Sequence, residues 1–309
     1  MIKRLFFSYG FYILIFLLII IFTLISNHFM SLSNWTQISI ASCFLLTAAA
    51  GLTVVLITGN IDLSVGSIAY IAASVAYLSA DQGPIITILA VIFVGAFLGL
   101  INGFLIAYLK MNSLLTTLGL LIAYRGISLV ITGGTVQKIG EQLSNFGNYK
   151  FFGFFPLIFA VSLILVIGIQ FIMKFTRFGR YCYAIGNNEI SANKLGIPVK
   201  KIKLYSFIIA GICGALSGLL LAMYLGEVTT FTGRGMEFQA VAAIVIGGTS
   251  LFGGRGSIMP GTFAGVLLLV IINNGLGSMG VSPYVYPFVA GSIIFLAIYL
   301  DSIKNTSSK

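Results

Sequence analysis

The sequence TAAAGLTVVLITGNIDLSVGSIAYIAASVAYLSA, residues 47–80, places a polar break between two apolar runs. The break, TGNIDLSVGS at 58–67, holds an Asp, an Asn, Ser and Gly, whereas the runs on either side carry no charge. Such a break indicates that one helix stops and another starts within or beside an apolar environment. We therefore expect Gly59 to end one helix and Asp62 or Ser64 to cap the next.

The composition sets the class of protein. The chain has 309 residues, of which 59% are hydrophobic and only 8% are charged. A soluble domain has about 25% charged residues, so most of this surface must face lipid. The net charge of +10 lies in the gaps between apolar runs, where basic residues set membrane orientation. The sequence therefore predicts a polytopic membrane protein with no nucleic-acid partner.

Apolar runs of spanning length recur along the chain. A spanning helix needs about 20 apolar residues, and two shorter runs, 236–249 and 258–273, are interrupted by Gly-rich sequence. We expect an all-α fold of about ten transmembrane helices, some short or broken, in one domain over residues 1–309. The first run follows Lys3 and Arg4 without a small-residue cleavage site, so we interpret it as a retained helix. The longer runs are 9–26, 40–58, 64–80, 85–109, 114–131, 154–173, 205–225 and 284–300.

The basic residues predict the orientation. Lys3 and Arg4 favour a cytoplasmic N-terminus, and ten crossings would return the C-terminus to the same side. The loop 174–203 is rich in Lys and Arg and falls on the cytoplasmic side by alternation. The loop 132–153 has only two lysines and falls outside. Loop charge and alternation thus agree.

Glycine spacing predicts close helix packing. The runs GAFLGLING (95–103) and AGICGALSG (210–218) place small residues three or four apart, which lets helix backbones approach closely. There is also an internal echo, since VLITGNIDLSVGSI (55–68) and VIGGTSLFGGRGSI (245–258) share one layout. Transporter folds are often built from such repeats.

The loop 174–203 contains a short helix with its own end signals. Asn187 or Asn188 is a good N-cap, and Glu189 lies in the first turn, where the helix dipole favours an acid. Gly196 suits the position after the last turn. A helix of about two turns is marginal in water, so it must be held against something.

Two interpretations of that helix stay open on physical grounds. Its apolar residues Ile190, Ala192 and Leu195 either pack on the protein's own surface or dock a separate cytoplasmic protein.

The loop sequence GRYCYAIGNNEISANKLGIPVKKIK (179–203) resembles the cytoplasmic coupling loop of bacterial ABC importer permeases, in the branch that serves ribose and related monosaccharides. Two further stretches resemble the same branch of this branched-chain-type permease family. They are TGNIDLSVGS (58–67) and AVAAIVIGGTSLFGGRGSIMPGTFAGVLLLVIINNGL (240–276). The resemblance runs in order over about residues 35 to 301.

The resemblance implies a permease in the bacterial inner membrane. Such a permease pairs with a second permease chain, identical or different, and docks a cytoplasmic ABC ATPase and an outer substrate-binding protein. No cofactor is expected in this chain, because ATP with Mg²⁺ is used by the partner subunit. Gly248 and Gly253 have P-loop spacing, but Gly254 stands where Lys is needed. The ATPase-coupling helix would comprise Asn187, Asn188, Glu189, Ala192, Leu195 and Gly196.

The outer segments suggest contacts for the binding protein. Glu227 and Arg234, in the stretch 226–238, are candidates, although ordinary surface loops have the same composition.

Polar residues in the apolar runs are candidates for the translocation path. For each residue, capping or bridging helices is the favoured interpretation, because a polar group at bilayer depth needs a partner. As a group they fit a hydrated path equally well. A sugar path favours amides and hydroxyls over a ring of charges. The candidates are Asn60, Asp62, Ser64, Asn102, Arg125, Gln239, Asn273 and Asn274.

The sequence leaves one alternative function. An ion-coupled secondary transporter of a small polar solute usually carries membrane-embedded acids, and Asp62 is the acid that lies well inside the apolar stretches. A membrane enzyme is disfavoured, because the chain has one His and lacks metal-ligand spacing or a nucleophile–base pair.

Overall fold

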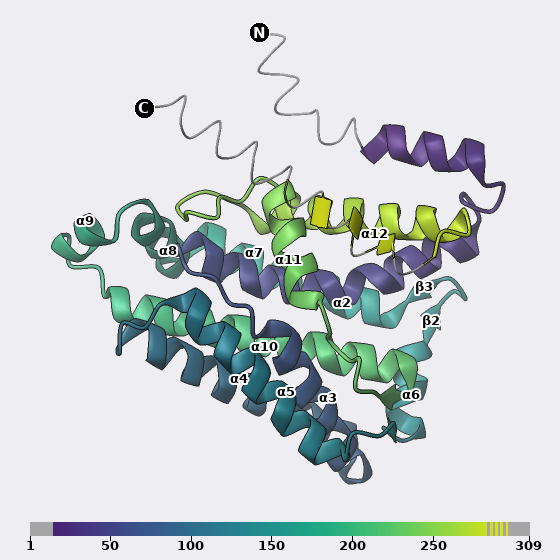
Figure 1. Cartoon of the computed structure of the whole chain (residues 1–309), viewed down its shortest axis with the longest axis horizontal. Helices are drawn as coiled ribbons and strands as arrows, with labels where there is room; N and C mark the ends of the chain where they lie inside the picture. Colours follow the sequence, from purple (N-terminus) through teal and green to yellow (C-terminus); the bar gives the residue numbers. More distant parts are fainter. Residues whose placement is uncertain (1–14, 283–284, 287, 290, 293–294, 296–309) are drawn as a thin grey trace, which may run out of the picture.

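The computed structural model describes residues 15–282, 285–286, 288–289, 291–292 and 295, and this part is predominantly helical (Figure 1). An apolar helix at Ile15–Ile25 precedes the labelled elements. The helices are α2 (Leu32–Ile57), α3 (Val65–Ser79), α4 (Pro84–Ala107), α5 (Ser113–Thr132), α6 (Glu141–Asn148), α7 (Leu157–Phe175), α8 (Arg177–Asn187), α9 (Glu189–Lys194), α10 (Val199–Leu225), α11 (Met236–Ile246) and α12 (Phe263–Ser278). Short turns η1 (Ala80–Gln82) and η2 (Ile258–Thr262) precede α4 and α12.

The prediction of an all-helical membrane protein is confirmed. Within the described residues, 6 helical segments are long and apolar enough to cross a membrane: α2, α4, α5, α7, α10 and η2 with α12 (Ile258–Ser278), which is kinked at Met259. The predicted run 64–80 forms α3, which has 15 residues and is mostly buried. The predicted run 284–300 lies mostly outside the described residues, so the count of ten stays a prediction.

Helix α10 is the centre of the bundle and packs on α4, α2 and α3. Its contact with α4 is backbone against backbone, as the glycine spacing predicted. A Cβ added at Gly95 would lie 2.7 Å from the Gly211 carbonyl oxygen and 2.5 Å from the Ala215 Cβ. Larger side chains here would force the two central helices apart.

The predicted loops contain more structure than expected. The loop 132–153 includes α6 and the strands β1 (Gln137–Lys138) and β2 (Lys150–Phe151). Strand β1 pairs with β4 (Glu227–Val228), and β2 pairs with β3 (Phe155–Pro156), both antiparallel. Two-residue strands carry too little pattern to be seen in the sequence.

The other correction concerns the loop 174–203. It contains α8 as well as the predicted short helix, and α10 begins at Val199 rather than near 205. Helix α8 has a signal that explains it. The buried residues Gly179, Cys182 and Ile185 recur every three residues, which is the spacing of one helix face.

Candidate functional site

The break between α2 and α3 is held by a buried hydrogen-bond network. Asp62 Oδ1 accepts from the Ser64 N–H at 2.9 Å and from Ser64 Oγ at 2.6 Å. Asn102 Nδ2, from α4, donates to Asp62 Oδ2 at 3.2 Å and to Ser64 Oγ at 2.7 Å. Asp62, Ser64 and Asn102 are all 0% exposed. The network therefore joins two helices through one carboxylate that meets only neutral hydrogen-bond donors.

This geometry corrects the predicted cap. Ser64 occupies the N-cap position of α3, but its side chain makes no capping bond, and Asp62 lies two residues before it. The Asp62 carboxylate binds the Ser64 amide and hydroxyl instead, so it fixes the turn that leads into the helix.

Tyr124 of α5 completes the network and was not predicted from the sequence. Its hydroxyl donates to Asn102 Oδ1 at 2.9 Å, and the residue is 4% exposed. The bond orients the Asn102 amide so that its NH₂ group faces Asp62. A weak signal for this role exists in the sequence, because Tyr124 precedes Arg125 within an apolar run and a buried phenol needs a partner.

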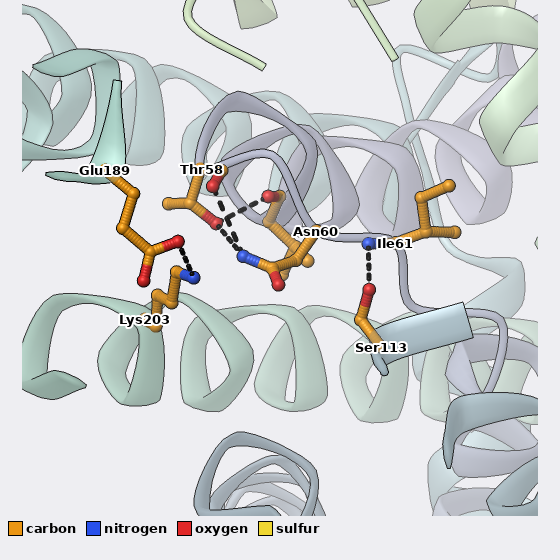
Figure 2. Close-up of polar contacts among 7 residues, drawn as sticks. Thr58, Asn60, Ile61, Ser113, Glu189 and Lys203 are labelled. Carbon is orange, nitrogen blue, oxygen red and sulfur yellow. Dashed lines mark hydrogen bonds and ion pairs between the residues drawn. The ribbon is translucent and has the colours of Figure 1, made fainter. Parts of the chain in front are cut away.

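Side chains of helix α5 also bind the backbone of the break. The Ile61 N–H donates to Ser113 Oγ at 3.3 Å, and the Leu63 N–H donates to Thr117 Oγ1 at 3.0 Å. Figure 2 shows the first of these bonds beside Asn60. Two hydroxyl side chains near the start of α5 thus accept hydrogen bonds from backbone N–H groups of the break, which have no helical partner.

The second Gly-rich segment lies against the first. The Gly254 N–H donates to the Ile57 carbonyl oxygen at 2.9 Å. A Cβ added at Gly253 would lie 2.8 Å from Gly59 Cα. Gly59 and Gly253 both have positive φ, +77° and +87°, where glycine carries no steric cost. The two sequences of the internal echo therefore meet at their breaks.

Helix α8 seats on both breaks at once. A Cβ added at Gly186 would overlap the Ile57 carbonyl oxygen and the Gly254 amide nitrogen. Tyr183, one turn earlier, donates its hydroxyl to the Gly256 carbonyl oxygen at 2.9 Å. We call this contact of Gly59, Gly186 and Gly253 the glycine junction. It brings together the three motif segments that the sequence analysis took from separate parts of the chain.

Helix α9 follows directly from α8. Asn188, rather than Asn187, is the N-cap, and its Oδ1 accepts from the Ser191 N–H at 2.9 Å. Asn187 is the last residue of α8 and donates its side-chain amide to the Tyr183 carbonyl oxygen at 2.9 Å. Gly196 has φ +79°, as expected after a last turn.

The three apolar residues expected on this helix do not share one face. Ala192 is 2% exposed and packs inward, whereas Leu195 is 81% and Ile190 is 71% exposed. Ile190 stands two positions from Ala192 and points the other way. Its outward direction depends on the cap position, which fixes the rotation of the helix. The helix lies at the opposite end of the molecule from β2 and β3 (Figure 1).

A cleft of about 790 Å³ opens between α9, the end of α4 and the start of α10. Glu189 crosses it with an ion pair, in which Lys203 Nζ lies 2.7 Å from Glu189 Oε2. Asn60 lines the cleft and is 7% exposed. Its Nδ2 donates to the Thr58 Oγ1 at 3.0 Å and to the Thr58 carbonyl oxygen. Figure 2 shows Asn60 and the ion pair on the same side of α10.

The remaining path candidates lie apart from this region. Arg125 is half-buried and donates to the carbonyl oxygens of Thr230 and Thr232 at 3.1 and 3.4 Å, so its guanidinium holds the segment that precedes α11. Asn274 and Asn34 exchange two side-chain hydrogen bonds of 2.9 and 3.0 Å. Asn273 is half-buried on the same helix.

Two of the remaining candidate residues share a pocket, and a third lies in a strand. Gln239 and Arg234 line one pocket of about 210 Å³, and the Arg234 guanidinium lies 5.6 Å from the Phe231 ring centroid. Glu227 sits in β4 opposite Lys138. The structure thus divides the eight path candidates among several places instead of aligning them.

Long apolar helices, two glycine-bounded breaks and a capped helix presented at one end define a polytopic membrane transport protein. The chain belongs to the family described as branched-chain amino acid transport system / permease component, which it matches over residues 34–298. The resemblance drawn from its three motifs is thereby confirmed. The family comprises transport permeases rather than catalytic enzymes, and it places this chain in the bacterial inner membrane as a multi-pass protein.

Individual relatives agree with this assignment. The chain is 33% identical to the ribose import permease protein RbsC of Escherichia coli K12 over 295 residues, which cover 93% of this chain and 91% of that protein. It is also 33% identical to the autoinducer 2 import system permease protein LsrC of Photorhabdus luminescens, over 90% of this chain and 85% of that protein. The LsrC protein of Yersinia pseudotuberculosis YPIII is 32% identical over 281 residues. No solved structure matches the chain.

Proposed function

We propose that this chain is the membrane-spanning permease subunit of an ATP-driven ABC importer that carries a monosaccharide such as ribose or a related sugar. The relatives named for ribose import and autoinducer 2 import support this substrate class. The proposal includes a second permease chain, a cytoplasmic ABC ATPase that uses ATP with Mg²⁺, and a binding protein that delivers the solute outside. Residues 1–309 would form one transmembrane domain with both termini in the cytoplasm.

The observation that carries the proposal is the form of α9. Two large apolar side chains are exposed here: Ile190, on the six-residue helix, is 71% exposed, and Leu195, its C-cap residue, is 81% exposed. A helix this short keeps its shape because Asn188 caps it and Ala192 anchors it. Exposed apolar anchors on a polar, charged loop favour insertion into a partner's groove over contact with lipid.

The glycine junction supplies a route for coupling. Helix α8 touches the α2–α3 break and the α11–η2 connection through backbone atoms. Backbone contacts at this distance leave no compliant side chain between the parts, so a shift of α8 moves both breaks. In the proposed cycle, closure of the ATPase moves α9 and α8, and the breaks then change access to the path.

The test is a double variant, Ile190→Asp with Leu195→Asp, in liposomes that contain the permease, its ATPase and the binding protein. We expect loss of ATPase stimulation by the loaded binding protein, because two charges would enter an apolar groove. The matched control is Phe152→Asp, since Phe152 is 93% exposed and directly follows β2, at the opposite end of the molecule from α9. Full transport by the double variant would refute the docking role.

The same liposomes separate this function from ion-coupled transport. The permease alone, with an imposed proton or sodium gradient and no ATP, is expected to move no sugar. Uptake under those conditions would establish the secondary transporter instead.

A further inference from the structure

The cleft beside α9 carries uncompensated positive charge. Lys110, Lys200 and Lys203 line it, and Glu189 is the carboxylate among its lining residues. Glu189 is already engaged with Lys203 at 2.7 Å. Lys110 and Lys200 are exposed and face the same space without a carboxylate partner in the described part of the chain.

The start of α10 adds to this charge. A helix N-terminus has a partial positive charge and favours acids in its first turn. Helix α10 has no acid there, begins with Val199 and Lys200, and has Pro198 at the N-cap without a side-chain bond. A 27-residue helix therefore points its positive end and a lysine toward the cleft, which is an arrangement that favours a bound anion.

The cleft also borders exposed apolar surface at the end of α4. Its wall includes Ala107 at the end of the spanning helix α4. Beyond it, Leu109 is 56% and Tyr108 is 36% exposed. The Lys200 ammonium lies 5.7 Å from the centroid of the Tyr108 ring, so an aromatic ring and a cation share the boundary between apolar and polar surface.

We propose that this cleft binds the headgroup of an anionic phospholipid, with the phosphate between Lys110 and Lys200 and an acyl chain along the exposed end of α4. Basic pockets between membrane helices at the water boundary are known to accept such headgroups. A lipid is favoured over an acidic protein surface because the apolar residues of α4 continue directly from the lysines. Glu189 and Ile190 of α9 also line the cleft, so the bound lipid would lie beside the helix proposed to dock the ATPase. The proposal concerns lipid binding alone.

The test is native mass spectrometry of the full-length protein with phosphatidylglycerol and, separately, phosphatidylcholine. We expect tighter binding of phosphatidylglycerol, weakened roughly 30-fold in Lys110→Gln with Lys200→Gln. The control, Lys138→Gln with Lys150→Gln, removes two exposed lysines at the opposite end and should change nothing. Equal affinity for the two lipids, or equal loss in both double variants, would overturn the proposal.

Two further arms identify the source of the anion. Leu109→Gln should weaken long-chain phosphatidylglycerol without affecting glycerophosphate, and it keeps both lysines if the double variant fails to fold. Displacement of the lipid by millimolar inorganic phosphate would assign a free-anion site and overturn the lipid. Unchanged lipid binding with loss of a co-purifying ATPase in the lysine variant would assign the cleft to a protein partner and overturn it as well.

Discussion

Replacing Tyr124 with Phe removes one hydroxyl from the buried network and keeps the volume of the side chain. The wild-type hydroxyl donates to Asn102 Oδ1 at 2.9 Å, and neither residue exceeds 4% exposure. In the variant, this amide oxygen has no donor, while its NH₂ group is still directed at Asp62. Side-chain hydrogen bonds between membrane helices contribute about 0.6 kcal/mol on average and up to about 1.7. A buried oxygen left without a donor adds a desolvation penalty. We therefore expect Tyr124→Phe to lower the free energy of unfolding by about 1 to 1.7 kcal/mol.

The assay is equilibrium unfolding in mixed micelles with increasing denaturing detergent. Tyr77→Phe is the matched control, because the Tyr77 hydroxyl on α3 makes no hydrogen bond within the described residues. The decisive comparison repeats Tyr124→Phe in an Asn102→Ala background, where the acceptor is already missing. If Tyr124→Phe costs the same in both backgrounds, the bond to Asn102 does not stabilise the fold and the reasoning fails.

Three other changes probe the same region. Asp62→Asn should retain transport, because the Asn oxygen can accept from Ser64 and the Asn102 amide group can turn to accept from the new NH₂ group. Asp62→Ala should lose transport, because it removes these hydrogen bonds. An Asp62→Asn variant that folds but does not transport would show that the charge itself is needed. Gly186→Ala should cost about 1–3 kcal/mol and uncouple ATP hydrolysis from transport, because its Cβ would overlap the Ile57 carbonyl; Gly126→Ala, with open space around it, is the control, and normal coupling in Gly186→Ala would contradict the junction's role. Burial raises the pKa of the Cys182 thiol to about 12, so its alkylation by a maleimide at pH 8 should be slow in the folded protein and rapid after denaturation; rapid labelling of the folded protein would show that α8 leaves its seat.

The sequence predicted local features well because their causes are local. Asn188, Glu189 and Gly196 occupy the positions that capping rules assign, since each acts on the turn beside it. The glycine spacing in 95–103 and 210–218 also predicted the close contact between α4 and α10. Composition alone was enough to predict a membrane protein, because a chain with 8% charged residues has too few of them to form a water-exposed surface.

What the sequence did not predict depends on partners far apart in the chain. Asp62 could have been a plain helix cap; only the approach of α4 and α5 shows that its carboxylate joins Asn102 and, through it, Tyr124. Such long-range pairing leaves no periodic trace in one sequence. The sequence also did not show that the Ile190 side chain points outward, because a cap shifted by one residue rotates a helix by about 100°. Capping rules allowed Asn187 and Asn188 alike, and the two choices expose different faces.

The glycine junction shows why three separate motifs belong together. Gly59, Gly186 and Gly253 come from three segments, and each looks in isolation like an ordinary helix end or turn. In space, Gly186 and Gly253 lack the side chains that would collide with neighbouring backbone, because a Cβ at Gly186 would meet Gly254 and a Cβ at Gly253 would meet both Gly59 and Gly186. A substitution at Gly186 or Gly253 therefore disturbs the shared contact. Gly186→Ala and Gly253→Ala should therefore lower the free energy of unfolding by less together than the sum of their separate effects, since the first displacement already opens the contact. Additive losses would mean that Gly186 and Gly253 serve unrelated turns.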